Sequence, residues 1–123
     1  MRAVLFTLTL FALAACDDGA ERMAAQMTGG SPSRGRVLIQ QVGCGSCHTI
    51  PGVPGAAARV GPPLAGIAGR TYLAGRLENT PSNMLRWLLT PQAVDSLTAM
   101  PSVGLTEAQA RDVAAYLYTL RQP

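Results

Sequence analysis

The apolar residues of this chain fall into one unbroken run at the N-terminus and several short stripes further on. Ala3 to Ala15 is apolar apart from two threonines. Beyond it, apolar side chains recur at helical spacing over 35–42, 81–89 and 107–120, and no stretch alternates in the way a half-buried strand does. We therefore expect an all-α protein, with three to four short helices joined by long loops.

Residues that favour helix ends mark the last two helices. Thr80 followed by Pro81 has the form of an N-cap with proline at the first helical position, and Pro91 stops the helix. Thr106, with Gln109 three residues later, has the capping-box form and opens the last helix. Both helices are thus predicted with a defined first turn.

The segments between and ahead of the helices are predicted to be irregular. Gly and Pro crowd residues 43–69, and 92–103 shows no sustained periodicity, so both are expected to be loops. Residues 16–33 are rich in Ala, Gly, Ser, Asp and Thr, which predicts a flexible tether with a short helical patch around 21–27. The remaining residues, 34–123, are expected to form one domain.

The apolar run at the N-terminus predicts a targeting segment. It follows Arg2 and is too short for a spanning helix, which needs about 20 apolar residues. It ends in Leu13-Ala14-Ala15-Cys16, which resembles the lipobox of bacterial lipoproteins and implies removal of residues 1–15 and lipidation of Cys16. Asp17 resembles the signal that retains such proteins at the periplasmic face of the inner membrane. An ordinary signal peptide with a chance cysteine is the alternative.

Composition narrows the class of protein. The 123 residues suffice for one domain, and 48% hydrophobic with 14% charged residues is not the composition of a disordered chain. A net charge of +3 without any run of basic residues argues against nucleic-acid binding. Three cysteines do not make a disulfide framework. With so few aromatic residues, the core of this small domain needs a large apolar group to fill it.

The sequence Cys44-Gly45-Ser46-Cys47-His48 is a C-x-x-C-H motif, the signature of c-type haem attachment. Two cysteines three positions apart on a tight turn can reach the two vinyl groups along one edge of a porphyrin, and His48 then presents its imidazole to the iron. A zinc ribbon would need a second pair of ligands, and a thioredoxin-like redox pair would need a βαβ setting. We therefore expect one haem c, attached covalently through Cys44 and Cys47.

A second axial ligand, if the iron has one, must be a methionine, because the chain has a single histidine. Met23 and Met27 lie in the predicted tether, and Met84 lies on a helix, where methionine usually fills the core. Met100 lies in a loop ahead of Pro101, which restricts its backbone. Since His/Met ligation is an established mode of c-type cytochromes, we predict Met100 as the ligand. A buried gap-filling role is the alternative.

Residues 35–120 resemble a class I cytochrome c. Gly35 and the segment 113–117 are similar to the crossing terminal helices of that fold, and 61–70 is similar to the family's G-P-x-L-x-G-x-x-G-R loop. The resemblance implies that the carbonyl of Pro62 accepts the Nδ1 proton of His48. It also implies that Arg70 lies near a haem propionate, the alternative for Arg70 being a solvated loop charge.

The stretch from Leu77 to Leu120 is similar to the cytochrome c domain fused to subunit II of some bacterial haem-copper oxidases. Together the two resemblances imply four further haem contacts: Leu64, Trp87, Leu88 and Thr98. Two departures stand out. Asp95-Ser96-Leu97 replaces the usual turn containing Pro-Gly ahead of the methionine, which puts the stiffness of that loop in doubt, and lysine is absent, so any basic docking surface must use arginine.

A haem with two thioether links and two axial ligands has no open coordination position, which suits one-electron transfer. We expect a monomeric electron carrier without catalytic residues or a small-molecule substrate. Its expected partners are a quinol-oxidising complex or dehydrogenase as donor and a terminal oxidase as acceptor. An electron-exit subunit of a periplasmic dehydrogenase and a haem sensor with a labile Met100 are the alternatives. The excess of arginine either steers docking to an acidic partner or is an ordinary solvated surface.

Overall fold

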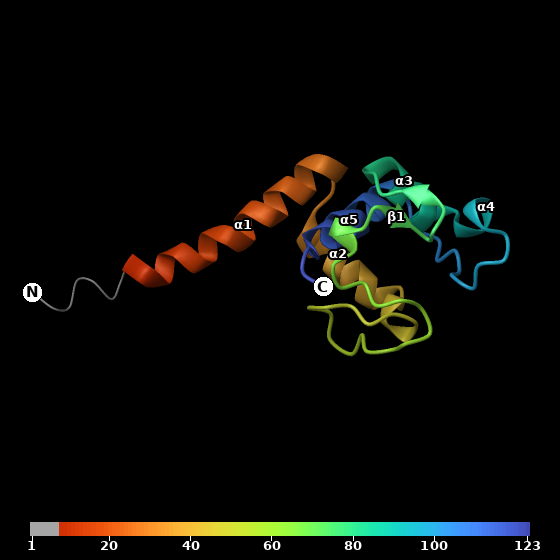
Figure 1. The fold of residues 1–123 in the computed structure, drawn as a ribbon, viewed down its shortest axis with the longest axis horizontal. Coiled ribbons are helices and arrows are strands. Elements are labelled where there is room, and N and C mark those ends of the chain that lie inside the picture. The colour runs from red at the N-terminus through yellow and green to blue at the C-terminus, as the bar shows by residue number, and fades with distance from the viewer. Residues whose placement is uncertain (1–7) are drawn as a thin grey trace, which may run out of the picture.

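The structure, a computed structural model, describes residues 8–123 and is mostly helical (Figure 1). Its elements are α1 (Leu8–Thr28), α2 (Pro32–Gln41), the 3-10 turns η1 (Cys44–Ser46) and η2 (Ile67–Gly69), strands β1 (Tyr72–Leu73) and β2 (Leu77–Glu78), α3 (Pro81–Leu89), α4 (Pro91–Val94) and α5 (Glu107–Thr119). The predicted all-α class is confirmed. Within residues 8–123, no helix is both long and apolar enough to cross a membrane.

The crossing of α2 and α5 forms the centre of the fold. The two helices meet at Gly35, where a Cβ atom would lie 1.9 Å from the carbonyl oxygen of Asp112 and 3.1 Å from Cβ of Tyr116. Only a residue without a side chain allows this approach. Ile39 of α2 and Val113 of α5 are each 1% exposed, so the crossing buries the apolar stripes of both helices.

The predicted starts of the last two helices are confirmed, whereas the first predicted helix, expected from residue 35, begins at Pro32. At α3 the Thr80 side chain accepts a hydrogen bond from the amide of Asn83 at 3.2 Å, with Pro81 at the first helical position. At α5 the amide of Gln109 donates to Thr106 Oγ1 at 3.2 Å, and the amide of Thr106 donates back to Gln109 Oε1 at 2.9 Å. These contacts satisfy amides of the first turn that have no partner within the helix.

The predicted flexible tether is wrong over residues 18–28, where the chain is helical. The expected helical patch at 21–27 is part of α1, which packs against α5. Ala24 and Thr28, one turn apart, are 0% and 1% exposed, and Arg111 of α5 donates a hydrogen bond to the carbonyl of Thr28 at 3.0 Å. The segment is rich in Ala, Met, Gln, Glu and Arg, which favour helix, and tertiary packing stabilises it further.

An ion pair between the buried Asp112 and the exposed Arg34 fixes the junction between α1 and α2. The Asp112 carboxylate of α5 accepts two hydrogen bonds from Arg34, each 2.9 Å, and one from the amide of Ser31 at 2.6 Å. The bonds from Arg34, together with the Ser31 amide, lower the pKa of Asp112, although burial opposes them. Asp112 therefore ties the segment entering α2 to the last helix.

Two short elements correct the predicted loops. Pro91 ends α3 as expected, but it also begins α4. The first three residues of the predicted loop at 92–103 are therefore helical. Strands were not expected, yet β1 and β2 pair as an antiparallel hairpin, with Tyr72 opposite Glu78 and Leu73 opposite Leu77. With two residues per strand, neither can show the alternation by which strands are recognised.

Candidate functional site

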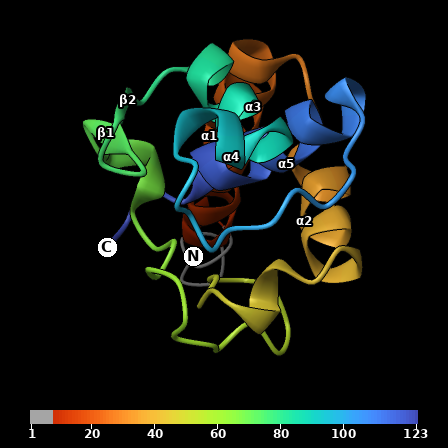
Figure 2. The same cartoon turned by 90° about the vertical axis from the view of Figure 1, so that its right-hand side faces the viewer.

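A single cavity of about 470 Å³ gathers all the residues that the sequence singled out as haem contacts. Its walls come from α2, η1, the loop after it, η2, the hairpin, α3, the loop between α4 and α5, and α5 itself. In Figure 2 these segments lie around the middle of the view. The predicted residues in its lining are Cys44, Cys47, His48, Pro62, Leu64, Arg70, Trp87, Leu88, Thr98 and Met100.

A tight turn presents the two cysteines and the histidine to this cavity. The backbone amides of Cys47 and His48 both donate to the carbonyl of Cys44, at 3.2 and 3.0 Å, so the three side chains leave one turn of 3-10 helix. Both thiols are free. Burial raises the pKa of the Cys44 thiol, which keeps it protonated and neutral near pH 7.

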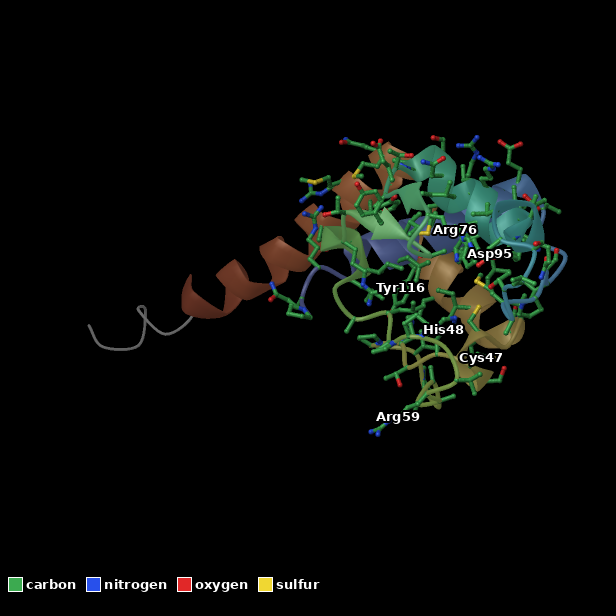
Figure 3. All side chains as sticks on the ribbon, turned by 45° about the vertical axis from the view of Figure 1, so that its right-hand side comes forward. Cys47, His48, Arg59, Arg76, Asp95 and Tyr116 are labelled. Atoms are coloured by element: carbon green, nitrogen blue, oxygen red, sulfur yellow. The ribbon has the colours of Figure 1, made fainter. Side chains whose placement is uncertain are left out.

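The ring of His48 is fixed from behind by the loop at 61–70. Nδ1 of His48 lies 2.7 Å from the carbonyl oxygen of Pro62. Because a carbonyl only accepts, Nδ1 must carry the proton, and Nε2 is left with its lone pair free to bind a metal. Gly61 lies flush against the ring, since a Cβ there would be 2.5 Å from His48 Cε1. Figure 3 shows His48 beside Cys47 among the side chains of the site.

The four methionine candidates separate clearly by position. Met23 and Met27 lie on α1 with exposed fractions of 50% and 44%, and neither lines the cavity. Met84 lines the cavity from α3 but is packed in the core at 1% exposed, whereas Met100 is half-buried at its rim. The structure thus retains Met84 and Met100 as residues within reach of a bound group, and ligation by Met100 stays a prediction.

The main chain of Met100 is held on both sides. Its amide donates to Thr98 Oγ1 at 3.2 Å, and its carbonyl accepts from Gln92 Nε2 at 2.7 Å. Ser102, two residues on, donates to the carbonyl of Leu89 at 3.2 Å. Gln92 is a positioning residue that sequence reasoning did not find, because its contact lies across a loop of unknown shape.

Arg70 reaches the cavity from the loop that also supports His48. Its guanidinium donates hydrogen bonds to the carbonyl oxygens of Pro63 and Ala65. These bonds stabilise the loop at 61–70. A contact with a propionate stays a prediction that rests on the family resemblance. The charge itself lies at the cavity, where it can attract an anionic group.

A hydrogen-bond network behind Arg70 went unnoticed in the sequence. Asn79 Nδ2 donates to the carbonyls of Ile67 and Arg70, each at 2.8 Å, and Asn79 Oδ1 accepts from the hydroxyl of Tyr118 at 2.8 Å. Burial raises the pKa of Tyr118 to about 12, so its hydroxyl stays a donor at neutral pH. The one local sign was a polar residue directly before the Thr80 N-cap, which does not reveal a partner 39 positions away.

Within residues 18–123, the motif residues do not belong to a zinc-type cluster of ligands. Over residues 18–123, no three side chains of His, Cys, Asp and Glu converge to hold an ion, and this includes the motif residues themselves. A structural zinc site needs four such ligands. The cavity is instead lined largely by apolar side chains, among them Leu64, Trp87 and Leu88, as suits a flat organic group.

Comparison with known proteins supplies the family. A family model for cytochrome c matches residues 32–121. This chain belongs to the cytochrome c family. The chain is also similar to cytochrome c oxidase subunit 2 of Alkalihalophilus pseudofirmus, with 30% identity over 90 residues, which cover 72% of this chain and 25% of that protein. The chain therefore spans about a quarter of the length of this relative. No solved structure matches this chain.

The residues of this cytochrome c fit a haem c. Two free thiols on one turn, one imidazole with Nε2 available and an apolar cavity are the groups that such a haem requires. Haem c is attached through Cys44 and Cys47, and it supplies reversible one-electron chemistry at its iron. The polypeptide contributes the imidazole of His48, a largely apolar wall and fixed loops on both sides of the cavity.

Proposed function

We propose that this cytochrome c is a lipid-anchored carrier that delivers single electrons to a terminal cytochrome oxidase at the periplasmic face of a bacterial inner membrane. The observation that carries the proposal is the similarity to a cytochrome c oxidase subunit 2 over 90 residues. A domain that resembles part of an oxidase subunit is suited to the same electron acceptor. His48 and Met100 would fill both axial positions, which leaves electron transfer rather than ligand binding as the task.

The anchor in this proposal is Cys16, which lies within α1. Two or more acyl chains attach a protein stably to a membrane, because each buried methylene contributes about 0.8 kcal/mol to the free energy of membrane binding. From Cys16 to Thr28 the chain is helical, and the last turns of this helix pack on α5. In Figure 1 the N-terminal part of α1 extends away from α4 and the loop that follows α4. This arrangement supports a cavity rim that faces away from the bilayer.

The fixed main chain of Met100 supports a carrier over a sensor. A sensor needs its methionine to leave readily so that a gas can bind, whereas a carrier gains from a site that reorganises little between oxidation states. The Met100 amide donates a hydrogen bond to Thr98, and the Met100 carbonyl accepts one from Gln92, so both backbone groups are held. The similar protein is an oxidase subunit, which gives no support to a role as exit subunit of a dehydrogenase.

The decisive experiment mixes the reduced, haem-loaded protein with a purified terminal oxidase of the same source and follows its oxidation by stopped flow. We expect oxidation that saturates with oxidase concentration and is blocked by cyanide. A protein that stays reduced on this timescale, while a dehydrogenase reduces it rapidly, would replace the oxidase proposal with the exit-subunit alternative.

Repeating the reaction at rising ionic strength tests whether the arginines steer docking. A rate that falls with ionic strength indicates steering, and a flat profile indicates an ordinary solvated surface.

Localisation needs its own measurement. Cys16→Ser removes the proposed acylation site and leaves the cavity untouched. The wild-type protein should sediment with the membranes of the expressing bacterium, and the variant should be found in the soluble periplasmic fraction or as unprocessed precursor. Equal membrane association of both proteins would dismiss the lipid anchor without affecting electron transfer.

A further inference from the structure

The turn ahead of Met100 is built by a carboxylate. Asp95-Ser96-Leu97 contains neither proline nor glycine, yet it is ordered by hydrogen bonds from the same residue. Asp95 Oδ1 accepts from the amide of Leu97 at 3.1 Å, and the carbonyl of Asp95 accepts from the amide of Thr98 at 3.1 Å. An aspartate that bonds to the backbone two residues on makes a turn in its own right. The stiffness that the sequence put in doubt thus comes from Asp95.

Two consecutive hydrogen bonds link Asp95 to the backbone of Met100 through Thr98. Thr98, whose amide is bonded to Asp95, accepts the amide hydrogen of Met100 at 3.2 Å. Only Ala99 separates Thr98 from Met100. Any movement of Asp95 therefore moves the backbone of Met100, unless these bonds break first.

The second oxygen of Asp95 points across the rim of the cavity to the hairpin. Asp95 Oδ2 lies 3.3 Å from Arg76 Nε, and Figure 3 shows the two residues next to each other. Arg76 belongs to the turn between β1 and β2, where its amide donates to the carbonyl of Leu73 at 2.9 Å. Over residues 18–123 no other ion pair or hydrogen bond joins the hairpin to the 95–105 loop.

The ion pair therefore joins two walls of the same cavity. Tyr72, Leu73 and Ala74 line it from the hairpin, and the loop contributes Asp95, Thr98, Ala99 and Met100. The side chains of Arg76 and Asp95 are 56% and 23% exposed, so water and salt screen the pair. A screened pair contributes little to global stability, and its effect is confined to the gap that it bridges.

We propose that Arg76 and Asp95 are positioning residues that form a clasp between the hairpin and the 95–105 loop and so keep the sulfur of Met100 over the haem iron. The proposal rests on Met100 ligation, which is part of the proposed function. A thioether is a weak ligand, so the bond depends on how closely the polypeptide holds the sulfur in place. Opening the clasp raises the fraction of time in which the loop, and with it Met100, swings away.

The test uses the full, haem-loaded protein and measures how fast imidazole binds to the ferric form, because imidazole enters only when Met100 leaves. Arg76→Gln and Asp95→Asn should each bind about two to five times faster than wild type, the range expected for loss of an exposed ion pair. The ferric thioether charge-transfer band should weaken at a lower temperature in both. Arg76→Lys keeps the charge and should restore most of the wild-type rate.

Further variants separate the clasp from other effects. The double variant Arg76→Gln/Asp95→Asn should equal either single variant, because the same contact is lost only once. Asp95→Ala should be faster still, since asparagine can keep the bond to the Leu97 amide and alanine cannot. Arg86→Gln removes a positive charge from an exposed position on α3 and should match wild type. The thermal midpoint should stay within a few degrees in all of them.

Three results would overturn the clasp, and they are distinguishable. If Arg76→Gln and Asp95→Asn bind imidazole at the wild-type rate while Met100→Ala binds it far faster, Met100 is a ligand but the ion pair does not position it. If Met100→Ala also matches wild type, Met100 is not a ligand, and both the ligation and the clasp fail. An additive double variant would likewise show that the two residues act separately.

Discussion

The carbonyl of Pro62 and Nδ1 of His48, 2.7 Å apart, make the histidine a ligand with one defined tautomer. The bond orients the ring and keeps the proton on Nδ1, which leaves the lone pair of Nε2 free. It forms because the amide of Gly61 donates to the carbonyl of Cys47 at 2.7 Å, which brings the loop at 61–70 directly behind the haem motif.

Gly61→Ala should damage the site through this contact. The new Cβ would lie 2.5 Å from His48 Cε1, so either the ring or the loop must shift, and the bond to Pro62 is strained. We expect a loss of about 1–3 kcal/mol in the free energy of unfolding of the haem-loaded protein, measured by denaturant titration. Gly69→Ala is the matched control, because a Cβ there meets nothing within 4 Å, and it should be close to wild type.

Met100→Ala should remove the second axial ligand. The ferric charge-transfer band of the thioether should disappear, and carbon monoxide should bind to the ferrous protein much faster than to wild type. Met84→Leu, a swap of similar volume in the core, should keep the band and cost less than about 1.5 kcal/mol. The opposite pattern, with the band lost only in Met84→Leu, would assign the ligand to Met84.

Gly35→Ala should be strongly destabilising because it forces α2 and α5 apart. A Cβ at this position would overlap the carbonyl oxygen of Asp112 at 1.9 Å. Backbone cannot yield as a flexible side chain can, so we expect a loss of about 3 kcal/mol, seen as a lower denaturant midpoint. Gly19→Ala on α1, where a Cβ meets nothing within 4 Å, should instead be neutral or stabilise by up to about 1 kcal/mol.

Asp112→Asn should make stability less dependent on pH. The folded protein lowers the pKa of Asp112, so the carboxylate stabilises the fold above its unfolded pKa of about 4, and this stability is lost as the pH falls through the lower folded value. At pH 7 the variant should lose about 1–3 kcal/mol of unfolding free energy, and the difference should shrink below about pH 4.

The control for Asp112 is the exposed pair of Glu107 and Arg111, 2.5 Å apart on one face of α5. Glu107→Gln should change the free energy of unfolding by no more than about 0.5 kcal/mol at any pH. Equal losses in the two variants at pH 7 would mean that burial of Asp112 adds nothing to its ion pair.

Interactions within a few residues were accessible from the sequence. The C-x-x-C-H motif specified the haem attachment, and Thr80 and Thr106 specified two helix starts, because each of these depends on neighbours along the chain. The same reasoning failed for residues 18–28, where a helix forms by packing Ala24 and Thr28 on α5.

What the sequence by itself determined is therefore the cofactor, the helical class and ten of the residues that line the cavity. Only the tertiary structure decided how the loops are braced: Asn79 by Tyr118, Met100 by Gln92, and Asp95 by Arg76. The physical reason is that a hydrogen bond or ion pair between distant positions leaves no periodic or local pattern in the chain. Such contacts exist only after the packing of α2 and α5 has brought the loops together.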